Sequence, residues 1–190
     1  GHGPFSHAFE HVTNHSHEDY TAKIILGETE LNQVLTEVSP RLPEDVVSII
    51  EHNHPNDILN QIISGQLDAD RMDYLLRDSY FSATSYGQFD LERILRTMRV
   101  RKIDENKKAL VVKYTGIHSV EDYIMARYQM YWQVYYHPVA RSYEAVFIQL
   151  FNRLKDIFKD NKEYFSDMKV LVPFLEKKEV TVEEYFRLDE

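Results

Sequence analysis

The sequence predicts a mostly α-helical protein with one small β-hairpin, and three observations support this fold class. Apolar residues recur at three- and four-residue spacing through most of the 190 residues, which is the pattern of helices with one buried face. Pro43 stands near a helix start, and Gly27 and Gly65 stand at helix ends, where these residue types are favoured. Only residues 98–114 differ, because two runs of β-branched and basic residues flank a polar turn there.

The helices before the hairpin follow from their start and stop signals. The first is short and begins near Pro4. The second begins after Ser16, a candidate N-cap, and stops at Gly27 as a C′ glycine would. Apolar spacing and further caps then predict helices over residues 28–38, 42–52, 56–64, 68–81 and 90–98.

From residue 119 to residue 158 the sequence predicts one long, aromatic-rich helix. Ser119 and Asp122, three residues apart, form a capping box at its start. Pro138 should bend this helix or break it in two, because proline cannot donate a hydrogen bond to the preceding turn. A short helix is expected near Thr181–Arg187. No Gly/Ser-rich linker or repeat divides the chain, so we expect one mostly helical domain with a hairpin-and-helix appendage.

Composition restricts the partners and the location. The net charge of −9, from 31 acidic and 22 basic residues, argues against nucleic-acid and anionic-membrane partners but allows a small anionic ligand. The absence of cysteine excludes disulfides and thiolate metal sites and fits a reducing compartment. There is no long apolar run and no charged leader before one, so we expect a cytoplasmic protein without a membrane partner.

Histidine is concentrated at the start of the chain, where its spacing suggests proton transfer. Five of the nine histidines fall in the first seventeen residues, interrupted by Gly, Pro, Phe and Ser, unlike an expression tag. His7 and Glu10 are three apart on the expected first helix, and His17 can fold back toward Glu10. A histidine–carboxylate pair of this kind holds one imidazole tautomer and raises its basicity. A solvated, histidine-rich helix start is an equally good interpretation.

A row of acidic and phenolic side chains is predicted on the helix over 68–81. Asp70, Tyr74 and Asp78 stand at i, i+4 and i+8, and Arg71 begins an adjoining row. Carboxylates on one helix face, with histidines elsewhere, are typical of sites for Mn, Fe, Zn or Mg. A charged surface with pairs such as Asp73–Arg77 would give the same pattern and is commoner.

A second row lies in the long helix. Arg127, Tyr131 and Tyr135 are again spaced i, i+4 and i+8, so that a guanidinium and two phenols share one face. A guanidinium binds phosphate through two parallel hydrogen bonds, and a tyrosine face stacks on a sugar or a base. The alternative is that these aromatic residues fill a core, which is the usual role of such a stripe.

Four segments, in one order over nearly the whole chain, resemble a known family. These are "GHGPFSHAFE", "NHSHE", "LDADRMDYLLRDSYF" and "ARYQMYWQVYYH", and together they are similar to HD-domain phosphohydrolases of the deoxynucleoside triphosphate (dNTP) triphosphohydrolase branch. The resemblance implies an HD-domain helical fold and a hydrolase that needs a divalent metal (Mg, Mn, Fe or Zn) to convert a dNTP to deoxynucleoside and inorganic triphosphate. Two alternatives stay open: a nucleotide-binding regulatory HD module without turnover, and an HD hydrolase of another nucleotide phosphoester.

The resemblance also implies roles for the histidines and the first acid of the row. Asp70 matches the last metal-ligand aspartate of the family. His2 and His7 match histidines that contact the phosphates and the scissile region. His17 with Glu10 matches the catalytic histidine–acid pair, where a relative can have Asp in place of Glu.

The remaining matches concern substrate binding. By resemblance, Arg71 and Arg127 stand against phosphate, and Tyr74 lines the sugar pocket. Asp78 matches an acid that bonds the sugar 3′-hydroxyl, and Tyr135 matches the tyrosine packed near C2′ that disfavours a ribose hydroxyl. These roles imply a deoxynucleotide as the partner.

The chain departs from the family pattern at two points. Tyr131 stands where relatives have histidine, which puts the base or sugar contacts there in question. The His-Asp dipeptide that names the family, and a further histidine ligand, would precede Gly1, so only Asp70 remains of the expected metal ligands. A lone carboxylate does not hold a catalytic cation. We therefore expect this chain to be metal-poor and weakly active or inactive.

The resemblance divides the chain and links its candidate sites. Residues 1–97 correspond to the C-terminal part of the HD core, and residues 98–190 to the hairpin, the long Tyr-rich helix that completes the cleft and the start of a C-terminal region. Relatives are commonly oligomers, so we expect a homo-oligomer. The nucleotide interpretation requires the histidines and the two rows to converge on one cleft.

Overall fold

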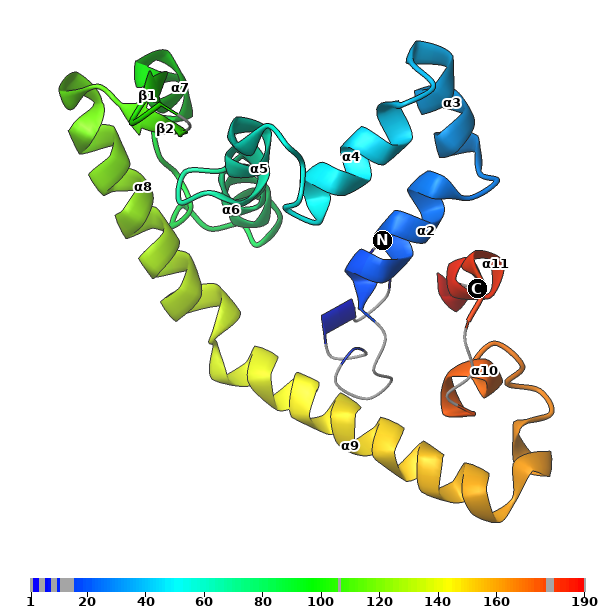
Figure 1. Ribbon diagram of the computed structural model, residues 1–190. Helices are drawn as coiled ribbons and strands as arrows, with labels where there is room; N and C mark the ends of the chain where they lie inside the picture. The colour runs from blue at the N-terminus through cyan, green and yellow to red at the C-terminus, as the bar shows by residue number, and fades with distance from the viewer. Residues whose placement is uncertain are drawn as a thin grey trace. The chain divides into compact units, whose positions relative to one another are not determined.

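The chain folds into two compact units in a computed structural model (Figure 1). One unit comprises Gly1–Val47 and Ser142–Glu190, and the other comprises Ser48–Arg141. These units group the residues differently from the expected parts 1–97 and 98–190, a division by family role that stays a prediction. The structure describes residues 2–3, 6–7, 10, 16–105, 107–176 and 180–189.

The first unit is helical and has an aromatic core. Its helices include α2 (His17–Leu26), α3 (Glu30–Val38), the start of α4 (Leu42–Ile50), most of α9 (Pro138–Asp160), α10 (Val172–Leu175) and α11 (Val182–Phe186), with short 3₁₀ turns η3 (Lys162–Phe165) and η4 (Arg187–Asp189). Tyr20 of α2 stacks on Tyr185 of α11, with ring centroids 3.8 Å apart, so α11 lies beside α2 (Figure 1). The buried side chains are Tyr20, Phe151, Phe158, Phe165, Phe174, Leu175, Val180 and Tyr185.

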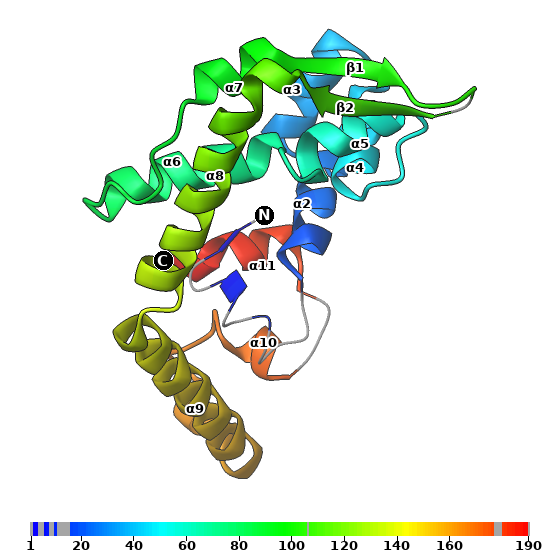
Figure 2. The ribbon, with the colours of Figure 1, turned by 90° about the vertical axis from the view of Figure 1, so that its left-hand side faces the viewer.

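The second unit combines helices with the hairpin. Its elements include α5 (Asp57–Ser64), α6 (Ala69–Phe81), α7 (Leu91–Thr97), β1 (Met98–Lys102), β2 (Lys108–Val112), the 3₁₀ turn η1 (Tyr114–Gly116), α8 (Ile117–Met130) and the π-helical turn η2 (Tyr131–Tyr135). Helix α5 packs against β2, while α6 and α7 pack against α8 (Figure 2). The buried side chains at their centre are Met72, Leu75, Ile94, Tyr123 and Met130.

The predicted hairpin is confirmed, and helix α5 covers one of its edges. β1 and β2 are antiparallel, with Met98 opposite Val112 and Lys102 opposite Lys108. The Gln61 side chain bonds the outer edge of β2, since its Oε1 accepts from a backbone N–H and its Nε2 donates to a backbone carbonyl of that strand. An edge strand satisfied in this way presents fewer free groups to another strand.

The mostly helical fold class is confirmed, and so is the N-cap at Ser16, which accepts from the backbone N–H of Glu18. Gly27 does end α2, but not as a left-handed C′ glycine, because its φ is −80°. A Cβ at Gly27 would lie 2.6 Å from the carbonyl oxygen of Lys23. Glycine is therefore needed there for close backbone approach rather than for a positive φ.

The capping box expected at Ser119 and Asp122 is wrong. Helix α8 begins two residues earlier, at Ile117, and its N-cap is Gly116, which has no capping side chain. The turn η1 leads directly into the helix, so the first turn is already formed when Ser119 is reached. The start of α8 is therefore set by the backbone that enters it from η1, and not by the side chains of Ser119 and Asp122.

The break predicted at Pro138 is confirmed, since α9 begins at Pro138. The structure adds the π-helical turn η2 before it, closed by a hydrogen bond of 2.8 Å from the Tyr136 N–H to the Tyr131 carbonyl. Single π turns inside α-helical segments are rare and often occur at functional sites. The long helix is thus divided into two α-helices by a π turn that carries two candidate site tyrosines, Tyr131 and Tyr135.

At both ends of the chain, the described residues form the helices that the sequence predicts. The C-terminal helix near Thr181 is confirmed as α11, and Thr181 with Glu184 forms a capping box. Ser6, His7 and Glu10 are helical, whereas the expected helix start at Pro4 lies outside the described residues. Within the described residues, no helix is long and apolar enough to cross a membrane.

Candidate functional site

Three of the candidate histidines lie together in the first unit. The ring centroids of His2 and His17 are 4.0 Å apart, and His7 lies 5.3 Å from His2 and 5.4 Å from His17, almost perpendicular to both rings. One ring nitrogen of each histidine lies within 4.8 Å of a ring nitrogen of the other two. We call His2, His7 and His17 the histidine cluster. His11 and His15 lie outside the described residues.

Glu10 bonds the histidine cluster from one side. Its Oε1 accepts from the His17 backbone N–H at 2.8 Å and also contacts His17 Nδ1, while its Oε2 lies 3.6 Å from His7 Nδ1. Because an ionised carboxylate only accepts, Nδ1 of His17 carries the proton of this contact, and the lone pair of the neutral ring is then on Nε2. The contact between His17 and Glu10 that spacing allowed is present, and its catalytic role stays a prediction.

Two pKa values in this region are shifted downward. Burial by itself would raise the pKa of Glu10, but the hydrogen bonds from the backbone and side chain of His17 outweigh it and hold the pKa below its usual range. Burial lowers the pKa of His2, and repulsion from His17 and His7 lowers it further. At neutral pH the region therefore combines an ionised Glu10 with an uncharged His2.

Neighbouring core residues fix the backbone on both sides of the cluster. His17 is the first residue of α2, directly after the N-cap Ser16. One turn later Tyr20 stacks on Tyr185, and a Cβ on Gly3 would lie 3.0 Å from the Tyr185 hydroxyl. The backbone next to His2 is thus packed against the same aromatic core that holds α2.

The two predicted rows meet in the second unit. The Tyr135 hydroxyl donates to Asp78 Oδ2 at 2.6 Å, and the Tyr135 ring meets Tyr74 edge to face at 6.1 Å and Tyr131 at 5.2 Å. These side chains come from α6 and η2, which are brought together by the packing of α6 on α8. We call Tyr74, Asp78, Tyr131 and Tyr135 the phenol cluster, and all four are half-buried.

Two phenols of this cluster, Tyr74 and Tyr135, have raised pKa values and stay protonated. Burial raises the pKa of Tyr135 far above its usual range, and its hydrogen bond to Asp78 adds to the shift. Burial also raises the pKa of Tyr74, with a further contribution from Tyr131. The guanidinium carbon of Arg127 lies 5.6 Å from the centre of the Tyr131 ring. The cluster therefore offers neutral hydroxyl groups and one carboxylate beside a cation.

Arg71 is positioned by Asp68, a residue that the sequence interpretation missed. The Arg71 guanidinium contacts both the Asp68 carboxylate and the carbonyl of Gly65, and its backbone N–H donates to Asp68 at 2.7 Å. Asp68 is only 1% exposed and is the N-cap of α6; burial raises its pKa, against the opposing pull of Arg71. The sequence does contain a signal for this pair, because Asp68 stands directly before a helix whose third residue is an arginine.

The described residues around Asp70 do not fit a divalent cation. Asp70 is exposed in the first turn of α6 and belongs to no described group of three histidine or acidic side chains within reach of one ion. Stable sites for such ions use several ligands. No chemical step is assigned to a metal at Asp70.

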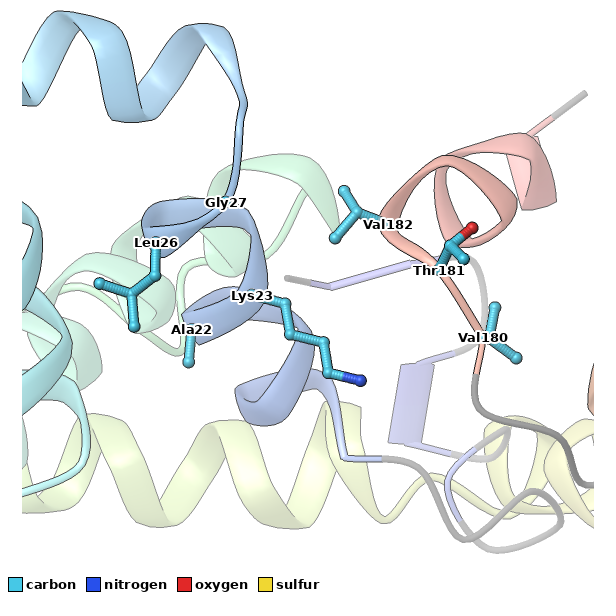
Figure 3. A pocket seen from close by; sticks show the side chains of 7 residues that line it. All are labelled: Ala22, Lys23, Leu26, Gly27, Val180, Thr181 and Val182. Atoms are coloured by element: carbon cyan, nitrogen blue, oxygen red, sulfur yellow. The ribbon is translucent and has the colours of Figure 1, made fainter.

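A cavity of about 560 Å³ lies elsewhere in the first unit, between α2 and the segment that leads into α11 (Figure 3). Its described lining contains none of the predicted site residues, and it is mainly aliphatic. One cationic side chain, Lys23, extends along it (Figure 3). The lining residues are Ala22, Lys23, Leu26, Gly27, Val180, Thr181 and Val182.

The second half of the chain matches the model of a known protein family. The model of a family described as "HD associated region" matches residues 89–190, which is more than half of the chain. The chain belongs to this HD-associated region family and is thereby related to the HD superfamily. The match includes the hairpin, α8 and the π turn, and therefore Arg127, Tyr131 and Tyr135.

Similar proteins occur in bacteria, archaea and eukaryotes. "Uncharacterized protein YwfO" of Bacillus subtilis is 50% identical over all 190 residues, which cover 42% of that protein. "Uncharacterized protein MJ1154" of Methanocaldococcus jannaschii is 41% identical over 74% of this chain and 28% of its own length. "Deoxynucleoside triphosphate triphosphohydrolase SAMHD1 homolog" of Dictyostelium discoideum is 26% identical over 87% of this chain and 35% of its own length. The chain thus spans less than half of each relative.

Proposed function

We propose that the chain is part of a phosphohydrolase that converts a dNTP to a deoxynucleoside and inorganic triphosphate. The observation that carries this proposal is the phenol cluster, in which Tyr135 and Asp78 are hydrogen-bonded to each other beside Tyr74, with Arg127 against Tyr131. A carboxylate and phenols suit a sugar, and a nearby guanidinium suits a phosphate. The name of the Dictyostelium relative supports the same substrate class.

Selection of deoxyribose would follow from the bond between Tyr135 and Asp78. Because the Tyr135 hydroxyl already donates to Asp78, the face of its ring is what remains to pack against a sugar. A ribose 2′-hydroxyl against that ring would be buried without a partner, which costs free energy. Asp78 has a second oxygen with which to accept from a 3′-hydroxyl.

The histidine cluster would supply the proton in the cleavage. Water adds its oxygen to the α-phosphorus and gives up one proton, the bond from that phosphorus to the 5′-oxygen breaks, and the 5′-oxygen takes a proton from an imidazolium, so that no net proton is consumed. An imidazolium held by Glu10 is a suitable donor, since the carboxylate orients the ring and stabilises its charge. His7 and His17 both face Glu10 and are the candidates.

The test is to incubate the full-length protein that contains this chain with each dNTP and Mg²⁺ or Mn²⁺, and to identify the products. Ion-exchange chromatography should show deoxynucleoside and tripolyphosphate in equal amounts. Tyr135→Ala should reduce the preference for dNTP over NTP by roughly tenfold, because the ring no longer rejects the 2′-hydroxyl. Tyr114→Ala, which changes an exposed tyrosine outside the cluster, is the matched control. Release of single phosphate or pyrophosphate, or an unchanged dNTP/NTP ratio, would contradict the proposal.

A specific observation favours a second function, nucleotide binding without turnover, for the 190 residues alone. The sequence contains no His-Asp dipeptide, and the described surroundings of Asp70 lack further metal ligands. Equilibrium dialysis with a dNTP that is retained but not converted would support this function.

A further inference from the structure

The histidine cluster has a geometry that proton transfer alone does not require. One histidine beside a carboxylate is enough to move a proton, yet three imidazoles converge in the first unit with one ring nitrogen each within 4.8 Å of the others. Three imidazoles at this distance repel one another when protonated. The neutral rings, by contrast, bring one nitrogen each into one small volume without this repulsion.

We propose that His2, His7 and His17 bind one transition-metal ion of the Zn²⁺ class through three imidazole nitrogens. Zinc takes imidazole nitrogens at about 2.0–2.1 Å, so tetrahedral ligands lie about 3.4 Å from one another. Side-chain rotations that move the ring nitrogens by about an ångström would bring them to that spacing. Imidazole ligands favour Zn, Cu, Ni or Fe over Mg and Ca, which prefer oxygen.

Glu10 occupies the position expected of a residue that orients metal-binding histidines. Its carboxylate faces Nδ1 of both His17 and His7, which leaves the Nε2 lone pair of each ring available. Metal-binding histidines commonly donate their other ring N–H to a carboxylate in this way, and loss of that partner weakens metal binding 10–100-fold. Glu10 thus orients His17 through a hydrogen bond, and its other oxygen lies at ion-pair distance from His7.

The site would keep an open coordination position. Three protein ligands leave the fourth tetrahedral position of zinc free, as in catalytic rather than structural zinc sites. A phosphate oxygen or a water can take that position. This ion site goes beyond the proposed function, because its ligands are three histidines rather than Asp70. Binding of the ion also does not require turnover of a nucleotide. A ring nitrogen that holds the ion cannot carry a proton, so ion binding and proton donation are alternative states of the cluster.

The test uses the metal-free 190-residue chain, Zn²⁺ in equilibrium dialysis and Co²⁺ as a spectroscopic probe. We expect one Zn²⁺ per chain and an intense visible d–d absorption with Co²⁺, which marks four- or five-coordinate rather than octahedral cobalt. His7→Ala and His17→Ala should each weaken binding more than tenfold. Glu10→Gln should weaken it 10–100-fold while keeping the Co²⁺ spectrum.

Two matched controls separate this site from other binding. His118→Ala removes an exposed histidine of the second unit and should leave binding unchanged. Asp70→Asn should also leave it unchanged; loss of Zn²⁺ with Asp70→Asn would assign the ion to Asp70 and overturn the inference. Non-saturable uptake, or uptake insensitive to the cluster variants, would overturn it as well. Far-UV circular dichroism of each variant shows whether the helices are retained, and Glu10→Gln is the informative variant if an alanine variant unfolds.

Discussion

At the scale of single residues, Glu10 and Asp68 show how burial and hydrogen bonding set the state of a carboxylate. Glu10 accepts two hydrogen bonds from His17, and its pKa is lowered despite burial. Asp68 is almost fully buried, and burial raises its pKa although Arg71 contacts it. Similar side chains thus have opposite shifts because desolvation prevails in one case and hydrogen bonding in the other.

The lowered pKa of Glu10 predicts a pH-dependent contribution to stability. A carboxyl whose folded pKa lies below its unfolded value of 4.5 stabilises the fold above that pH, and the stabilisation is lost as pH falls through the folded pKa. Glu10→Gln should therefore lower the free energy of unfolding at pH 7 by an amount on the order of 1 kcal/mol. The difference from wild type should shrink as pH falls below 4.5 and disappear once the pH is below the folded pKa.

Denaturant unfolding of both proteins at several pH values measures this difference. Glu18→Gln, which changes an exposed glutamate in the first turn of α2, is the control and should show a smaller change at pH 7. A Glu10→Gln effect that stays constant from neutral to acid pH would show that the charge of Glu10 is not responsible.

At the scale of elements, the junction of α7, β2 and α8 depends on a single glycine. Gly116 is buried between η1 and α8, and a Cβ there would lie 2.7 Å from Thr97 Cβ and 2.9 Å from Val112 Cγ1. Thr97 is buried and cannot turn away freely, because its hydroxyl donates to carbonyl groups of α7. The path of the chain into α8, and hence the position of Arg127 and the π turn, rests on this close packing.

Gly116→Ala should destabilise the second unit by about 1–3 kcal/mol, the usual cost of forcing a methyl group into a packed region. Chemical denaturation followed by circular dichroism measures the change. Thr115→Ala, at the exposed neighbouring position, should stay within about 0.5 kcal/mol of wild type. Equal stability of Gly116→Ala and wild type would mean that α8 can start along a different path.

At the scale of the whole molecule, the chain passes between its two units inside helices, within α4 and again within α9. The second unit also exposes aromatic side chains at four-residue intervals, with Tyr128 on α8, Trp132 on η2 and Tyr136 directly after η2. Trp132 is 66% exposed and is the single tryptophan of the chain. Exposed aromatic residues in such a row are typical of protein–protein contacts.

We predict that the protein self-associates through this row, in keeping with the homo-oligomer expected from the sequence. Sedimentation velocity should show a concentration-dependent increase in mass, and the fluorescence of Trp132 should shift to shorter wavelength as its exposure falls. Trp132→Ser should weaken association by about 2 kcal/mol, as for an aromatic residue at the centre of an interface. Tyr164→Ser, at an exposed tyrosine of the first unit, should not. A protein that is monomeric at all concentrations would contradict the prediction.

The sequence predicted the elements well wherever the signal was local. The helices, the hairpin and the break at Pro138 follow from apolar spacing, turn residues and the missing N–H of proline, which act over a few residues. The start of α8 and the role of Gly27 were predicted wrongly, because both depend on what packs against the backbone.

By itself, the sequence determined the helical class, the order of the elements and the residue types available for chemistry, since these are properties of neighbouring residues. Only the tertiary structure decided which of those residues meet. Tyr135 donates to Asp78, which lies 57 positions away in the sequence. The Arg71 guanidinium contacts Asp68 and Gly65, and three imidazoles lie together in the histidine cluster. The physical reason is that such contacts depend on how helices pack, and a π turn or a buried aspartate leaves little trace in the spacing of apolar residues.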